Sequence, residues 1–243
     1  MKAKTFLSVT VFLLTFHSVY SQKLFKAIED QNIEKISKLI DKGKNVNQQI
    51  ENGLTPLFSA AATGNIKIVE LLLSKGANVN TQLESNATAL HIAAQEGFTN
   101  IVKLLLENKA NPNLKDINDW TALRYATRNN KFDVVKILVE NNAEVDSKAK
   151  DLATPFASAI GKGYLNIAEF LIENGANINN LDKDNDTPMM YCAQSGNVEA
   201  AKFLLQYKPD LTLKNKAGKT ALDLAKEKNN TALVKLLQEN NPN

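Results

Sequence analysis

Short apolar clusters alternate with polar stretches along most of this chain. In residues 55–80, Leu57, Ala60 and Ala61 fall on one face of a short helix. Residues 68–73 then supply a wider apolar face, which needs cover from two sides. The pattern predicts two short helices followed by a polar hairpin, and the paired alanines allow the helices to approach closely.

Residues that favour helix ends bound the same two predicted helices. Thr55 can cap the first helix with its hydroxyl, and Pro56 fits the first helical position because its missing N–H needs no partner. Gly64 turns the chain between the helices, and Gly76 lies where a left-handed cap ends the second.

The threonine of this unit recurs every 33 residues without insertion or deletion. Such a period is typical of a helical repeat array, whose core forms by stacking each unit on its neighbours. Arrays of this kind work through an extended surface rather than a catalytic cleft. The six copies are Thr55-Pro56-Leu57, Thr88-Ala89-Leu90, Thr121-Ala122-Leu123, Thr154-Pro155-Phe156, Thr187-Pro188-Met189 and Thr220-Ala221-Leu222.

This plan resembles the ankyrin repeat over the whole of residues 22–243. The resemblance is carried by Thr88-Ala89-Leu90-His91-Ile92-Ala93-Ala94, by Thr55-Pro56-Leu57 with Ala60-Ala61, and by Gly175-Ala176-Asn177-Ile178-Asn179. It implies an all-α solenoid of β-turn–helix–helix units, with hairpin tips and first helices lining a concave side. We expect one domain of about seven units, with polar capping repeats at both ends.

One hairpin position departs from the repeat pattern. Two residues before each threonine, the other units have Gly53, Asn86, Asp119, Asn185 and Gly218, all of which suit a turn, whereas one unit has Leu152. Because leucine disfavours left-handed backbone, we expect the hairpin before Thr154 to be distorted or loose.

Residues 1–21 have the layout of a secretory signal peptide. Lys2 and Lys4 precede an apolar run from Phe6 to Val19, and cleavage is predicted before Gln22. An uncleaved membrane anchor is the alternative, but the run is shorter than the ~20 residues that span a bilayer. We therefore expect export to a periplasm or to the medium, without membrane association after cleavage.

Charge and reactive side chains exclude several classes of function. The predicted signal peptide has two lysines and no acidic residue, so 29 basic residues fall to 27 against 26 acidic ones, which argues against a nucleic-acid partner. His91 and Cys192 are then the sole histidine and cysteine; His91 lies where the ankyrin family uses histidine to brace adjacent turns, and Cys192 replaces a packing alanine. We expect no enzyme activity, no cofactor and no metal.

The unit that begins at Thr121 differs most from its neighbours. Trp120 lies just before that threonine and Tyr125 four residues after it, although packing requires a large aromatic side chain at neither position. Tryptophan, tyrosine and arginine dominate binding hot spots. The sequence predicts a protein-binding centre made of Ile117, Trp120, Tyr125 and Arg128, flanked by Ile92, Gln95, Tyr191 and Gln194. In the alternative, Trp120 folds flat against a neighbouring hairpin and only fills a gap.

These patterns favour a non-catalytic, monomeric protein-binding module. Its composition and predicted signal fit an exported bacterial protein, either an adaptor for an envelope enzyme or an inhibitor or immunity protein that blocks a toxin. A secreted effector that binds host proteins and a purely structural scaffold are the alternatives.

Overall fold

The computed structural model describes residues 22–241, and the predicted signal peptide lies outside this range. The described chain contains one 3-10 turn, η1 (Glu51–Gly53), and no strand; none of its helices is long and apolar enough to cross a bilayer. Its α-helices are α1 (Gln22–Glu29), α2 (Ile33–Asp41), α3 (Pro56–Thr63), α4 (Ile66–Ser74), α5 (Ala89–Glu96), α6 (Thr99–Glu107), α7 (Ala122–Arg128), α8 (Phe132–Glu140), α9 (Pro155–Lys162), α10 (Leu165–Glu173), α11 (Pro188–Ser195), α12 (Val198–Leu205), α13 (Ala221–Glu227) and α14 (Thr231–Asn240).

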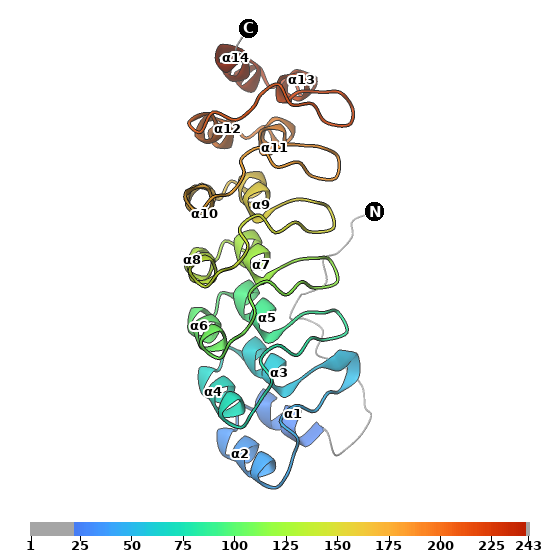
Figure 1. The fold of residues 1–243 in the computed structure, drawn as a ribbon, viewed down its shortest axis with the longest axis vertical. Helices are drawn as coiled ribbons and strands as arrows, with labels where there is room; N and C mark the ends of the chain where they lie inside the picture. The colour runs from blue at the N-terminus through green and yellow to red at the C-terminus, as the bar shows by residue number, and fades with distance from the viewer. Residues whose placement is uncertain (1–21, 242–243) are drawn as a thin grey trace.

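Consecutive helices form pairs that stack into an elongated array (Figure 1). The odd-numbered helices form one column, the even-numbered helices a second, and the hairpins project on the side away from the even-numbered helices. Helices pack mainly within a pair or against the neighbouring pair, as in α3 against α5 and α2 against α4. The all-helical solenoid predicted from the repeat is confirmed. We number its units first to seventh, as residues 22–54, 55–87, 88–120, 121–153, 154–186, 187–219 and 220–241.

Threonine and glycine cap the helices as the sequence predicts. The Thr55 hydroxyl accepts the N–H of Phe58 at 3.1 Å, and the threonines that precede α7, α9, α11 and α13 do the same. Gly64 ends α3 in the left-handed conformation, as glycine also does after α5, α9 and α11.

Cys192 lies in the core where other units have alanine, and burial raises the pKa of its thiol to about 12. An unreactive packing role follows.

Backbone hydrogen bonds hold each hairpin against the previous one. The N–H of Ile117 donates to the Ser85 carbonyl at 2.8 Å, and that of Lys150 donates to Asn118 at 3.1 Å. Equivalent bonds begin at Glu84, Lys183 and Lys216, at 2.8–2.9 Å. The hairpins therefore share one register along the array.

A second ladder, made of asparagine side chains, joins the units beyond the second helices. Asn113 donates from Nδ2 to the Asn142 carbonyl at 3.0 Å, and its Oδ1 accepts the N–H of Glu144 at 2.8 Å. Asn47 and Asn80 make the same two bonds to the units that follow them. At the next rung Asp146 only accepts, from Asn177 and Asn180, because a carboxylate has no N–H to donate. Asn47, Asn80 and Asn113 thus each join their own unit to the one that follows.

The hairpin with Leu152 is regular, so the expected distortion is wrong. Leu152 donates to the Ala149 carbonyl at 2.8 Å, as Asp119 does to Asp116 at 2.9 Å. Its φ of 59° matches the 58° of Asp119. The hydrogen bonds to the neighbouring hairpin hold this geometry, and the leucine takes the left-handed conformation at a cost in strain.

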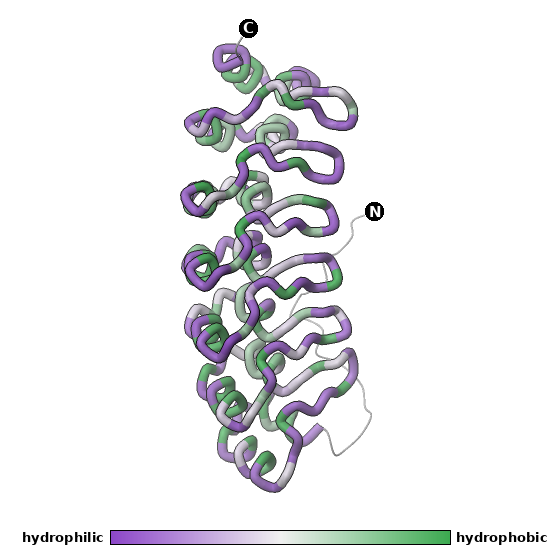
Figure 2. The backbone as a smooth tube through the Cα atoms, in the orientation of Figure 1, coloured by the Kyte–Doolittle hydropathy of each residue, from purple (hydrophilic) through white to green (hydrophobic). Residues whose placement is uncertain are grey.

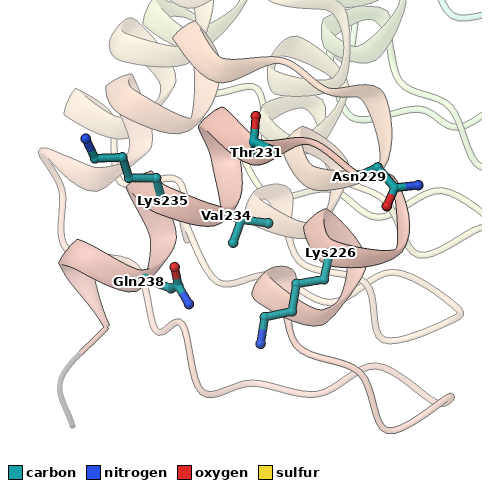
Figure 3. Close-up of a pocket in the computed structure, with 6 residues that line it drawn as sticks. All are labelled: Lys226, Asn229, Thr231, Val234, Lys235 and Gln238. Atoms are coloured by element: carbon teal, nitrogen blue, oxygen red, sulfur yellow. The ribbon is translucent and has the colours of Figure 1, made fainter.

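Both ends of the array have polar outer faces. Figure 3 shows the open groove of about 300 Å³ beside α13 and α14, where a further unit would otherwise stack. Its lining is largely polar and exposed, and Figure 2 shows hydrophilic colour over much of the hairpin edge and the terminal helices. The lining residues are Lys226, Asn229, Thr231, Val234, Lys235 and Gln238.

Candidate functional site

Trp120 contacts two arginines of the helix that follows it. Arg124 and Arg128 lie one turn apart on α7, with their guanidinium carbons 4.9 and 5.2 Å from the Trp120 ring centre. Contacts of this type contribute about 0.5–2 kcal/mol each. The indole is half-buried, so one part is fixed by packing and another faces solvent.

Tyr125 lies beneath this cluster and fastens the hairpin to the helix. Its hydroxyl donates to Asp116 Oδ2 at 2.7 Å, and the other Asp116 oxygen accepts the N–H groups of Asn118 and Trp120, both at 2.8 Å. The Tyr125 ring packs edge-on against Trp120, with centroids 5.1 Å apart. Burial and the bond to Asp116 raise the pKa of the Tyr125 hydroxyl.

Burial changes what two of the predicted contact residues can do. Tyr125 is 6% exposed, with its ring against Trp120 and His91, and Ile92 is 3% exposed within the hydrophobic core. They offer almost no surface to a partner, and their role is to support the residues above them. The sequence pattern does not show whether the position four residues after a capping threonine is buried or open to solvent.

The flanking residues lie on neighbouring units. Tyr191 donates to Asp182 Oδ2 at 2.7 Å, repeating the Tyr125 arrangement two units later, and it is half-buried. Gln194 is exposed and donates to Asp186 Oδ2 at 2.7 Å. Gln95, on α5, donates to Glu96 at 2.9 Å. The predicted set thus spans units three to six, and only Ile117, Trp120, Tyr125 and Arg128 belong to one hairpin and the helix after it.

His91 braces adjacent turns, as the resemblance implies. Its Nδ1 accepts the Thr88 N–H at 3.1 Å, so Nε2 carries the ring proton and donates to the Trp120 carbonyl at 3.1 Å. Burial lowers the pKa of the ring, which favours this neutral form. His91 therefore fixes the backbone of the tryptophan and has no catalytic partner among the described residues.

Arg124 occupies the equivalent position in the fourth unit and was missed by the sequence reasoning. Its Nη1 donates to the Ala153 carbonyl, the counterpart of the bond from His91, and Nη2 lies 3.0 Å from Asp151 Oδ2. The side chain is 3% exposed, and its Nε has no hydrogen-bond partner. The position three residues after a capping threonine is the signal that could have identified it.

Ile117 supplies the exposed apolar surface. It is 52% exposed at the hairpin tip, and among the described residues only Leu152, at 45%, is a comparably exposed large apolar side chain. No group of three histidine, cysteine or acidic side chains within residues 22–241 is placed to hold a metal ion. The exposed Ile117 side chain suits contact with another molecule.

Comparisons with known proteins agree with this architecture. A family model described as "Ankyrin repeats (3 copies)" matches residues 24–116, 79–149, 114–182 and 156–243. The crystal structure of the human ASB11 ankyrin repeat domain is similar, with a TM-score of 0.79 and 30% sequence identity over 90% of this chain and 99% of that one. No curated protein matches the chain. Ankyrin repeats generally mediate protein–protein interaction and are not catalytic. The chain belongs to the ankyrin-repeat family.

Proposed function

We propose that this protein is an exported, monomeric, non-catalytic binding protein that holds a partner protein at Ile117, Trp120 and Arg128. The observation that carries the proposal is the Trp120 indole in contact with three side chains of α7. Arg124, Arg128 and Tyr125 hold Trp120 in place, next to the hairpin whose tip exposes Ile117. A fixed aromatic ring loses little conformational freedom on binding, which favours affinity.

The predicted signal peptide adds the location. Its basic start and short apolar run support export, so the partner would be a periplasmic or secreted protein. Within that location the protein would serve as an adaptor for an envelope enzyme, or as an inhibitor or immunity protein that blocks a toxin. Fractionation of cells that express the full chain tests this part: recovery of the protein only in the cytosol would contradict it.

Affinity capture tests the binding surface. The chain from Gln22 onward serves as bait beside Ile117→Ser and Arg128→Ala variants, which alter exposed or half-buried side chains and leave the buried brace intact. Leu152→Ser is the matched control, because it also removes an exposed apolar side chain from a hairpin. A partner captured by the wild type and the control, but lost with both site variants at unchanged melting temperature, supports the proposal. Equal capture by all four proteins contradicts it.

A further inference from the structure

The tip residues of successive hairpins form a row whose charge changes sign along the array. Each lies at the same position in its unit, and all are exposed. Two are acidic in the first two units, one is apolar in the third, and three are basic in the fourth to sixth. The row, here called the tip row, is Glu51, Glu84, Ile117, Lys150, Lys183 and Lys216.

The backbone keeps the tip row in regular order. From Glu84 to Lys216, each member donates its N–H to the preceding hairpin, at 2.8–3.1 Å. Stacked helices lie about 8–10 Å apart, so neighbouring tips are separated by about one such step. An extended peptide advances about 3.3 Å per residue. Three residues of an extended chain therefore span one unit.

The lysines at the basic end are available to a partner. Within residues 22–241, Lys150, Lys183 and Lys216 make no side-chain ion pair, whereas Lys219 pairs with Glu227 at 2.6 Å. The hairpins of units four to six contain six lysines and four aspartates.

Most of these aspartates are already engaged within the protein. Asp151 pairs with Arg124, Asp182 accepts from Tyr191, and Asp186 accepts from two amides. Asp184 is the exposed one of the four whose carboxylate takes no side-chain partner. At the other end of the row, residues 48–54 and 81–87 contain no basic residue.

We propose that the tip row binds an extended segment of the partner protein whose charges are ordered along its length. Basic residues of that segment face Glu51 and Glu84, an apolar side chain meets Ile117, and acidic residues face Lys150, Lys183 and Lys216. This inference rests on the proposed function and adds the partner's chemistry and its direction of charge. A uniformly acidic or uniformly basic segment would meet repulsion at one end of the row.

Two synthetic peptides of identical composition provide the probe. In the ordered peptide, two lysines, one leucine and three glutamates follow in that sequence, each separated by two serines. In the control peptide the lysines and glutamates alternate. Several exposed ion pairs gained together amount to about a tenfold difference in Kd, with the ordered peptide tighter. The difference should shrink at high salt, because exposed charges are screened.

Matched charge reversals locate the peptide on the protein. The triple variant Lys150→Glu, Lys183→Glu, Lys216→Glu should remove the preference for the ordered peptide. The control triple Lys35→Glu, Lys67→Glu, Lys103→Glu makes the same change in net charge on exposed lysines of α2, α4 and α6, and it should keep the preference. Circular dichroism checks that both triples are folded.

Four results would overturn the inference. Three concern the peptides: no measurable binding of the ordered peptide, equal binding of both peptides, or an equal loss of the preference for the ordered peptide in both triple variants. The fourth is tip-row-dependent binding of a single-stranded oligonucleotide or an anionic phospholipid vesicle in place of the peptide.

The captured partner separates this inference from the proposed function. If capture is lost with Ile117→Ser and Arg128→Ala but unaffected by the tip-row triple, the binding surface stands and the charge order fails. If neither set affects capture, both proposals fail.

Discussion

The third and fourth units place different side chains at one position, three residues after the capping threonine. In the third, His91 is neutral, and both of its ring nitrogens are hydrogen bonded. In the fourth, Arg124 is a buried cation whose Nε lacks a partner and whose ionic partner, Asp151, is 46% exposed. The backbone they brace is nearly the same, so the fold tolerates two very different solutions at one site.

Other unfavourable features gather in the fourth unit. Leu152 takes a left-handed backbone conformation, Asp146 cannot donate in the asparagine ladder, and the hydroxyls of Thr127 and Ser147 are buried without a partner. Strain and unsatisfied groups often collect next to binding sites, where they lower local stability. We expect the fourth unit to open more readily than the third, and the following changes test the difference between them.

Removal of the arginine brace should have the largest effect. Arg124→Ala takes away the donor to the Ala153 carbonyl and the guanidinium stacked on Trp120, and it leaves a cavity. We expect a loss of about 2–4 kcal/mol in the free energy of unfolding, measured with urea. Arg128→Ala removes the half-buried arginine that contacts the same Trp120 ring, and it should lower the free energy of unfolding by under about 1 kcal/mol. Equal losses of unfolding free energy in the two variants would show that buried Arg124 stabilises the fold no more than half-buried Arg128.

His91 and Arg124 should make different contributions to the pH dependence of stability. Burial lowers the pKa of His91 in the folded chain below its ordinary value of 6.5. The stability from the neutral ring is therefore full above pH 6.5 and is lost as the pH falls below it, with a slope of up to about 1.4 kcal/mol per pH unit. In a chain that starts at Gln22, His91 is the sole histidine, so urea unfolding between pH 7.5 and 5 reports on it.

Histidine substitutions serve as controls for this slope. His91→Gln should flatten stability between pH 6.5 and 5, and Arg124→His should steepen it by adding a second buried imidazole to the fourth unit. An unchanged slope in His91→Gln would assign the pH dependence to the carboxylates.

Relief of the strained hairpin should stabilise the fourth unit. Leu152→Asn introduces the residue type that other hairpins use at this left-handed position, and we expect a gain of about 0.5–1 kcal/mol. Thermal unfolding measures the gain. Ile117→Asn is the control, because it removes a comparably exposed apolar side chain without changing a left-handed residue, and it should leave the melting temperature nearly unchanged.

Exchange of the ladder residues between the two units should have the smallest effect. Asp146→Asn supplies the missing donor for the Gly175 carbonyl, and Asn113→Asp removes the equivalent donor from the rung before it. We expect a gain and a loss of about 0.5 kcal/mol respectively. Urea unfolding of both variants and of the double variant tests this, and the same sign for both single changes would refute the ladder account.

Much of this fold could be predicted from the sequence, because its determinants are local. A threonine precedes six of the first helices and is followed by proline in three of them, glycine ends four of these helices, and the fixed period defines the stacking. The asparagine ladder has its own trace in the sequence, because Asn47, Asn80, Asn113 and Asn179 lie at multiples of 33 residues from one another. Their hydrogen bonds reach the next unit, which local patterns do not describe.

The candidate site was only partly predictable. Trp120, Arg128 and Ile117 differ from their counterparts, so comparison of the units finds them. The burial of Tyr125 and Arg124 depends on how closely the next helix and hairpin approach, and no residue type encodes that distance. For Leu152 the local preference was right, but hydrogen bonds to the neighbouring hairpin outweigh it.

The pairing of each unit mainly with its neighbours also sets how the molecule would respond to force. A pull on the two ends loads every interface in series, and the weakest interface separates first. If the interface between the fourth and fifth units is the weakest, stretching would divide the array into a four-unit and a three-unit part before either unravels. A single-molecule pulling record would then show this separation as its first length step. When Leu152 and Asp146 are both replaced by asparagine, a different interface should separate first.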